Sequence, residues 1–404
     1  MSASDALPVT LRRTTRRQWL EGVSASALLA HLPAGAQNRP ACDPISDWSD
    51  FVTRHVQRDG RVVDFDTPQQ HSTSEGQSYS LFFALVHNDR TTFARVLAWT
   101  QNNLCSGSLA ARLPAWQWGL KPDGSWGVLD VHPASDADLW IAYCLLEAGR
   151  LWREPRYGAL GRAVLSRVAR EEVLSLEGLG AIVLPWPASL ARPPVYRLNP
   201  SYLPVQLLRR FAQEDVQGPW SEIADNTVRL LGAVSPHGFV PDWCAWSGER
   251  KTFVTDPEKG TTGSYDAIRA YLWAGMLDVQ EPARAELLSA LFGPRHLLEQ
   301  PQAELPELVD TATGLGRGRA NVGFAAALLP YLRAQGSTSA LAVQSARVKA
   351  RATVPPAGSA PPLPYYERML ILFGQGWLDG RYAFDRKGHL QPHWSSPCHS
   401  TRMP

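Results

Sequence analysis

Three stretches of the sequence place a carboxylate close behind a serine, just before an apolar run. The stretches are "STSEGQSYS", "PASDADLW" and "GSYDAIRAY". Their acids are Glu75, Asp136, Asp138 and Asp266. Ser72 and Ser135 stand at capping-box distance from an acid, and Ser264 is a candidate N-cap, so each stretch predicts the start of a helix. Capping alone accounts for an acid at such a position, and chemistry therefore requires that several of them share one site.

Glycoside hydrolysis is the chemistry that such a shared site would suit. It needs one protonated carboxyl group to assist the leaving oxygen and one ionised carboxylate to activate water or attack carbon. Fifteen tryptophans are a high count for this length, and rings beside polar residues are typical of surfaces that stack on sugars. The predicted aromatic lining is Tyr79, Trp116, Trp118, Trp126, Trp140, Tyr202, Trp243 and Tyr265.

The position of Glu75 at a helix start conflicts with the role of a general acid. A helix N-terminus favours the ionised carboxylate and lowers its pKa, which does not suit a general acid. Glu75 can act as the acid only if burial and a neighbouring negative charge outweigh the helix dipole. Asp136 or Asp138 could supply that charge.

The elements that must position these acids are helices. Apolar residues recur at helical spacing in twelve segments, of which some are apolar nearly all round and others carry a charged face. The segments are 47–57, 76–88, 90–104, 136–152, 157–173, 199–212, 220–234, 264–277, 283–293, 322–336, 338–352 and 364–377. Buried helices that alternate with half-exposed ones predict an all-α (α/α)6 barrel with six inner and six outer helices. If the three acid-bearing helices are inner ones, their N-termini open at the same end, and the acids converge there.

Residues 1–36 read as an export signal of the twin-arginine type. Arg16 and Arg17 precede "QWL", a mildly apolar stretch and the small residues at 34–36. Residues 37–404 are predicted to form a single domain, with a proline-rich loop at 352–364 and a short C-terminal hairpin around 387–388. The mature protein is expected to be periplasmic or secreted. In that compartment Cys42 and Cys398 could pair, provided that the chain ends meet.

Bulk properties exclude other classes. A net charge of +2 is too even for a nucleic-acid partner, and no further segment predicts a membrane span. The five cysteines and ten histidines show no spacing typical of a metal site, so no metal is expected.

Four blocks of the sequence resemble a known family. "STSEGQSY", "PASDADLWIAYCLLEAGRLW", "RLNPSYLP" and "SYDAIRAYLWAGM" look like the motifs of glycoside hydrolase family 8, in the family's order. The similarity runs from about Asp47 to Trp394 and is greatest to the periplasmic endoglucanases encoded beside bacterial cellulose synthases. The resemblance implies an (α/α)6 barrel that cuts internal β-1,4 bonds of cellulose-like glucans with inversion and without a cofactor. A partnership with the cellulose synthase and export machinery is a further implication.

The resemblance also implies roles for single residues. Glu75 matches the family's general acid, Asp266 its general base and Asp136 an active-site acid that holds a distorted sugar. An inverting mechanism goes with roughly 6.5–9.5 Å between acid and base. Arg269, one helical turn after Asp266, is expected to orient the base or the substrate. The predicted substrate-binding residues are Tyr79, Trp116, Trp118, Asp138, Asn199, Tyr202, Asp242, Tyr265 and Arg269.

The sequence departs from the family pattern in two places. Ser80 stands where glycine is usual, and the region from Pro185 to Arg197 has diverged, which leaves substrate contacts there undefined. Other functions stay open at this point. The same barrel could act on chitosan, mixed-linkage glucan or xylan, or it could serve as a glycan-binding scaffold with little turnover.

Overall fold

The computed structural model describes residues 46–352 and 363–395. The predicted export segment, Cys42, Cys398 and most of the proline-rich loop lie outside these residues. Within the described part of the chain, no helix is both long enough and apolar enough to cross a membrane.

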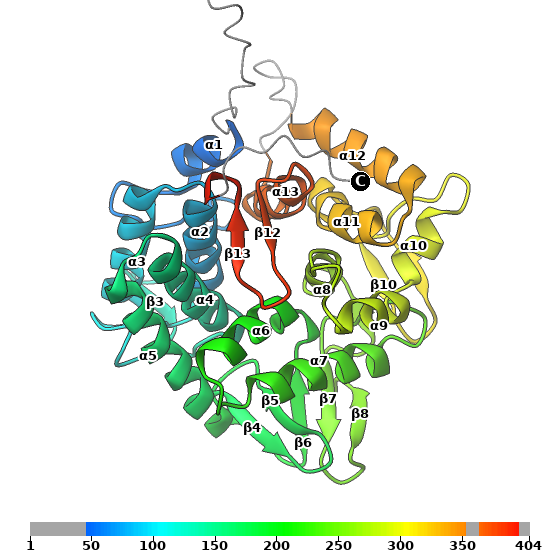
Figure 1. Ribbon diagram of the computed structural model, residues 1–404, viewed down its shortest axis with the longest axis horizontal. Coiled ribbons are helices and arrows are strands. Elements are labelled where there is room, and N and C mark those ends of the chain that lie inside the picture. Colours follow the sequence, from blue (N-terminus) through cyan, green and yellow to red (C-terminus); the bar gives the residue numbers. More distant parts are fainter. Residues whose placement is uncertain (1–45, 353–362, 396–404) are drawn as a thin grey trace, which may run out of the picture. The chain divides into compact units, whose positions relative to one another are not determined.

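Six buried helices form an inner ring. Each packs against the next in chain order, and Phe373 of the last meets Phe83 of the first at 4.6 Å between ring centroids, which closes the ring. In Figure 1 they surround the middle of the molecule. The inner helices are α2 (Ser74–Val86), α4 (Ser135–Leu151), α6 (Val205–Glu214), α8 (Ala267–Gly275), α11 (Val322–Ala334) and α13 (Tyr365–Leu378).

Six further helices lie outside them, each packed on an inner helix. The outer helices are α1 (Ser46–His55), α3 (Arg90–Leu104), α5 (Pro155–Glu171), α7 (Trp220–Val234), α9 (Ala283–Ala290) and α12 (Thr338–Ala352). They bury one face and leave the other charged face to solvent, as the sequence pattern requires. The (α/α)6 barrel and its twelve helices are confirmed, except that the helix predicted at 199–212 begins only at Val205, after the 3-10 helix η2 (Pro200–Tyr202). One predicted helix is divided, because residues 283–293 give α9 and then the start of the short α10 (Gly293–Leu298).

Short strands occupy the connections that lead from an outer helix into the next inner helix. No pattern in the sequence predicts them. They are β1 (Ser72–Thr73), β2 (Gln117–Leu120), β3 (Trp126–Asp130), β4 (Val173–Leu176), β5 (Gly180–Val183), β6 (Val195–Leu198), β7 (Cys244–Ser247), β8 (Thr252–Thr255), β9 (Thr262–Gly263), β10 (Leu308–Asp310) and β11 (Leu315–Arg317). The 3-10 helices η1 (Ala188–Leu190) and η2 (Pro200–Tyr202) lie in the same connections. The connections that contain these strands therefore gather at the N-terminal ends of the inner helices.

The predicted C-terminal hairpin is confirmed as β12 (Tyr382–Phe384) and β13 (Leu390–Pro392), followed by η3 (His393–Ser395). It lies across the middle of the ring in Figure 1. Buried Glu147, in the last turns of α4, accepts hydrogen bonds from Leu390 N at 2.9 Å and from Arg210 Nε at 2.7 Å. The hairpin is thereby tied to the C-terminal part of α4, away from the end where the strands gather.

Candidate active site

Helix α2 begins beside Glu75, but its cap differs from the prediction. The N-cap is Thr73, whose hydroxyl accepts from Gly76 N at 3.1 Å. The predicted capping box of Ser72 with Glu75 is wrong, because Ser72 Oγ instead accepts from Arg61 Nε at 2.8 Å. The Glu75 side chain is thereby free to serve another purpose in the first turn.

The predicted serine caps of the other two acid-bearing helices are also wrong. Helix α4 has Ala134 at its N-cap position and no side-chain cap, and Asp136 Oδ1 accepts from Ala137 N at 2.8 Å. At α8, the Ser264 hydroxyl donates to the backbone carbonyl of Glu307, the residue directly before β10.

Asp242 caps α8 from a different part of the chain. Its Oδ1 accepts from the backbone N–H groups of Ser264, Asp266 and Ala267 at 2.7, 3.1 and 2.8 Å. Burial raises the pKa of Asp242 to about 6, although these bonds favour its ionised form. Asp242 thus fixes the backbone that carries Asp266. Its carboxylate bonds to backbone groups, so it supports the site and does not bond to the side chains of the cavity.

A cavity of about 370 Å³ lies at the N-terminal ends of α2, α8 and α13. Glu75 and Asp266 both line it, as the predicted convergence requires. The other lining residues are Val62, Asp64, His71, Thr73, Gly76, Tyr79, Tyr265, Arg269, Tyr365, Tyr366 and Met369.

Arg269 joins three of the predicted residues. Its Nη1 donates to Asp136 Oδ2 and to Tyr79 Oη, each at 2.9 Å, and its Nη2 donates to Asp266 Oδ1 at 2.6 Å. Arg269 and Asp136 are almost completely buried, whereas the Asp266 side chain keeps 30% of its surface exposed. The second oxygen of Asp266 accepts from Trp243 Nε1 at 3.1 Å. Both Asp266 oxygens therefore have donors that stabilise the ionised carboxylate.

Glu75 lies in a contrasting environment. Its Oε1 accepts a single hydrogen bond, from Trp116 Nε1 at 3.2 Å, and its Oε2 is buried without a partner. Burial and the negative charge of Asp136 raise the pKa of Glu75 to about 8. The conflict noted in the sequence is thus resolved, because loss of solvation and Asp136 outweigh the favourable helix end.

Asp136 and Asp138 face different surroundings. Burial raises the pKa of Asp136 to about 6, and Arg269 opposes the rise. Asp138 is completely buried, is not among the residues that line the cavity, and lies within hydrogen-bonding reach of buried Glu172. Burial and Glu172 raise the pKa of Asp138 well above its usual range. Neither Asp136 nor Asp138 lines the cavity, but Asp136 bonds to Arg269, which does, whereas Asp138 lies beside Glu172. A contact of Asp138 with substrate stays a prediction.

The remaining predicted residues divide into exposed and buried ones. The prediction that Trp140 lines the site is wrong, because its ring is completely buried in the core. Trp116 and Tyr265 keep 38% and 44% of their surface exposed, and half-buried Trp118 stacks on Trp126 with ring centroids 5.5 Å apart. Asn199 is buried, and its Oδ1 accepts from Ser201 N and Ser201 Oγ. The exposed rings are accessible to a ligand, whereas Asn199 holds the turn that carries Tyr202.

Tyr202 is placed between two of the groups around the base. Its ring lies 5.5 Å from the guanidinium carbon of Arg269 and meets the Trp243 ring edge-on at 6.0 Å. Tyr202 therefore packs against both residues that donate to Asp266.

Several lining residues were not singled out from the sequence. Tyr365 and Tyr366 begin α13, and the rule that inner helices open at one end would have found them. Asp64 and His71 are joined by backbone bonds and belong to an irregular segment before α2, which gave no signal.

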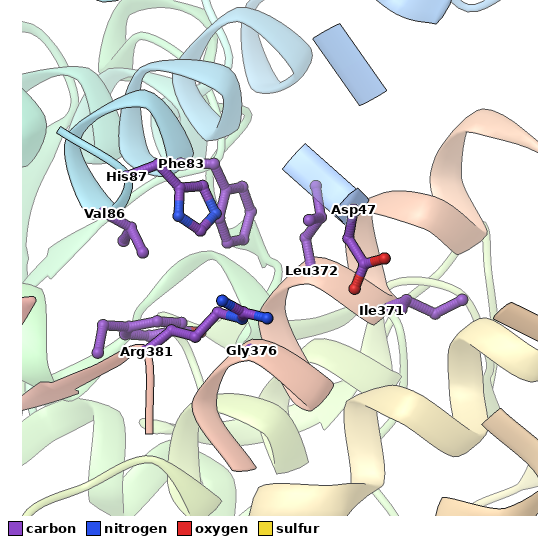
Figure 2. A pocket seen from close by; sticks show the side chains of 9 residues that line it. Asp47, Phe83, Val86, His87, Ile371, Leu372, Gly376 and Arg381 are labelled. Carbon is purple, nitrogen blue, oxygen red and sulfur yellow. The ribbon is translucent and has the colours of Figure 1, made fainter. Parts of the chain in front are cut away.

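A second hollow lies at the other end of α2 (Figure 2). It is lined by Phe83, His87 and Arg381 among others, and its volume is about 10 Å³. Such a space holds about one water molecule. Burial and Arg381 lower the pKa of His87 to about 3, so this histidine is neutral at physiological pH. The hollow is too small for a sugar.

An (α/α)6 barrel whose inner-helix N-termini bring two carboxyl groups with contrasting partners to one aromatic-lined cavity has the arrangement that glycoside hydrolysis requires. Residues 20–380 match the family described as glycosyl hydrolases family 8, and the chain belongs to this family.

Named relatives agree with this assignment. The chain is 52% identical to an endoglucanase of Xanthomonas axonopodis pv. citri (strain 306), over 95% of this chain and 98% of the relative. It is 44% identical to an endoglucanase of Escherichia coli (strain K12), over 87% and 92%. Among solved structures, an endo-1,4-D-glucanase from Vibrio fischeri ES114 is similar with a TM-score of 0.81 and 41% identity, over 87% of this chain and 99% of that one.

Proposed function

We propose that this chain is an exported endo-β-1,4-glucanase that hydrolyses cellulose or cellulose-like glucan with inversion of configuration. The observation that carries the proposal is the contrast between Glu75, whose pKa is raised to about 8, and Asp266, whose two oxygens accept from Arg269 and Trp243. One site thus offers a proton donor and an ionised base. The relatives named endoglucanase, at up to 52% identity, support a β-glucan as the substrate.

In this mechanism Glu75 protonates the glycosidic oxygen and Asp266 takes a proton from the water that attacks the anomeric carbon. Asp136 contributes the charge that keeps Glu75 protonated. Its contact with the distorted sugar, implied by family resemblance, remains part of the proposal. The exposed rings of Trp116 and Tyr265 would stack on neighbouring sugar units.

The cellular role is proposed from the sequence. The twin-arginine-type segment at residues 1–36 supports a periplasmic or secreted enzyme that trims cellulose chains beside the synthase and export machinery. That role would make the nascent glucan chain the partner, with no cofactor required.

The test uses the purified mature chain and carboxymethylcellulose, with viscosity and new reducing ends followed together. We expect a fast fall in viscosity for the wild type, and a loss of at least about a hundredfold in kcat for Glu75→Gln and for Asp266→Asn. Glu177→Gln, at an exposed glutamate bonded to Lys251, is the matched control and should keep full activity. A wild type that cuts neither this substrate nor chitosan or xylan would overturn the proposal and favour the glycan-binding scaffold.

A further inference from the structure

A network of charged and aromatic side chains lies behind the base, outside the mechanism described above. Arg197 belongs to β6, Trp243 directly precedes β7 and Asp256 directly follows β8. Leu198 pairs with Cys244, and Cys244 pairs with Thr255. The register therefore brings Arg197, Trp243 and Asp256 to the same end of one three-stranded sheet.

The same register places the three side chains on one face. Arg197 pairs with Ala245, which is two residues from Trp243, and alternate residues of a strand project to the same side. Asp256 follows Thr255 and so lies opposite Trp243 across the ladder. Neighbours of this kind on adjacent strands are close enough for long side chains to touch.

The guanidinium of Arg197 is held in a fixed plane. Its Nε donates to Asp256 Oδ2 at 2.7 Å and its Nη2 to Asp256 Oδ1 at 3.1 Å, and its Nη1 donates to Glu258 at 2.5 Å. The Asp256 side chain is completely buried, and its Oδ1 also accepts from the backbone N–H groups of residues 258 and 259. A forked bond to an anchored carboxylate fixes both the position and the tilt of the guanidinium.

Two indole rings pack on this guanidinium. Its central carbon lies 4.9 Å from the ring centroid of Trp243 and 5.7 Å from that of Trp186. The two indoles stack on each other with centroids 5.6 Å apart and 26° between their planes. Cation–π contact and stacking together limit the rotation of the Trp243 ring. That ring donates Nε1–H to Asp266 Oδ2 at 3.1 Å.

We propose that Arg197 is a positioning residue for the hydrolysis, because it holds the Trp243 indole at the angle at which its N–H bonds to Asp266. The inference rests on the proposed role of Asp266 as the base. It assigns a purpose to the diverged segment from Pro185 to Arg197, since Trp186 and Arg197, near its two ends, both contact the Trp243 ring.

A double-mutant cycle on carboxymethylcellulose hydrolysis tests this chain of contacts. Arg197→Lys keeps the charge beside Asp256 but loses the flat, forked guanidinium. Trp243→Phe keeps a ring but loses the N–H group. We expect each single variant to lower kcat about tenfold with KM changed less than about twofold, and we expect the double variant to be no slower than Trp243→Phe alone. Glu177→Gln, at an exposed glutamate that bonds to Lys251 and takes no part in this network, is the matched control and should keep the wild-type kcat.

Several results would overturn the inference. They are additive losses in the double variant, an Arg197→Lys variant with the wild-type kcat, and losses that appear only in KM, which would make Trp243 a sugar platform. Thermal unfolding of each variant shows whether the fold is intact. If Arg197→Lys does not fold, Asp256→Asn, which loosens the same guanidinium, replaces it in the cycle with the same expectations. A wild type without activity, or an active Asp266→Asn variant, would instead contradict the proposed function.

Discussion

Replacing Glu75 by glutamine should stabilise the protein by an amount that grows with pH. The Glu75 carboxyl group has one hydrogen bond, from Trp116, and a buried oxygen without a partner. The folded protein therefore holds the neutral form in preference to the ionised one. Glutamine cannot ionise, so the substitution removes the free-energy cost of ionising a buried side chain at high pH.

The pKa of Glu75 sets the size of the effect. It is about 8 in the folded protein and 4.5 for an ordinary glutamate. Between these values the unfolded chain has released the proton and the folded chain still holds it, so the free energy of unfolding falls as the pH rises through this window. At about 1.36 kcal/mol for each pH unit, the loss reaches at most about 5 kcal/mol above pH 8 and is only about 1 kcal/mol at pH 5.

Urea unfolding at pH 5 and pH 8.5 measures this difference directly. We expect the stability of Glu75→Gln relative to the wild type to grow between the two pH values, by up to about 4 kcal/mol. Any cost of placing an amide beside Trp116 is the same at both pH values and cancels. Glu177→Gln provides the control, because Lys251 lowers the pKa of that exposed glutamate. A stability difference between Glu75→Gln and the wild type that does not change with pH would refute the reasoning, since Glu75 would then ionise as freely in the folded protein as in the unfolded chain.

Two further predictions concern opposite ends of the barrel. Asp136→Asn removes the negative charge that helps to raise the pKa of Glu75. The fall of kcat/KM at high pH, expected near pH 8, should therefore move to lower pH by about one unit. A pH–rate profile in which this fall does not move would contradict the prediction. Glu147→Gln removes the completely buried one of the two carboxylate partners of Arg210, which keeps its bond to Glu214, and it weakens the bond to the hairpin at Leu390. We expect a loss of about 1.5–3 kcal/mol in urea unfolding with kcat at 25 °C unchanged. An unaltered unfolding midpoint would show that the hairpin does not depend on this ion pair.

The helical part of the fold could be predicted because it follows from a local pattern. Apolar residues at helical spacing located all twelve helices of the barrel, and the alternation of buried and charged-faced segments gave the two rings. The strands were missed because each spans only two to five residues, which is too short to show a periodic pattern. Some form short local hairpins, such as β4 with β5, and others pair with a distant segment, as β6 does with β7.

The candidate site was predictable to the extent that one helix end implies another. Glu75, Asp136 and Asp266 were found because each stands at the start of an inner helix. Asp138 lies beside Glu172 and not beside Arg269 as Asp136 does, because residues two apart on a helix do not face each other.

The contacts that hold the site residues in place were harder to predict from the sequence. The cap of α8 by Asp242 and the stack of Arg197, Trp186 and Trp243 are contacts between distant segments. A local sequence pattern carries no record of such contacts.

The contrast between Glu75 and Asp266 shows what sets protonation in this site. Both acids stand at the start of an inner helix, so the helix dipole favours the ionised form of each about equally. Their partners differ. Glu75 has one donor, Trp116, and a buried oxygen without a partner. Asp266 has a guanidinium on one oxygen, an indole N–H on the other and a side chain that still reaches solvent. Burial and the number of hydrogen-bond donors, rather than position on the helix, therefore distinguish the proposed proton donor from the proposed base.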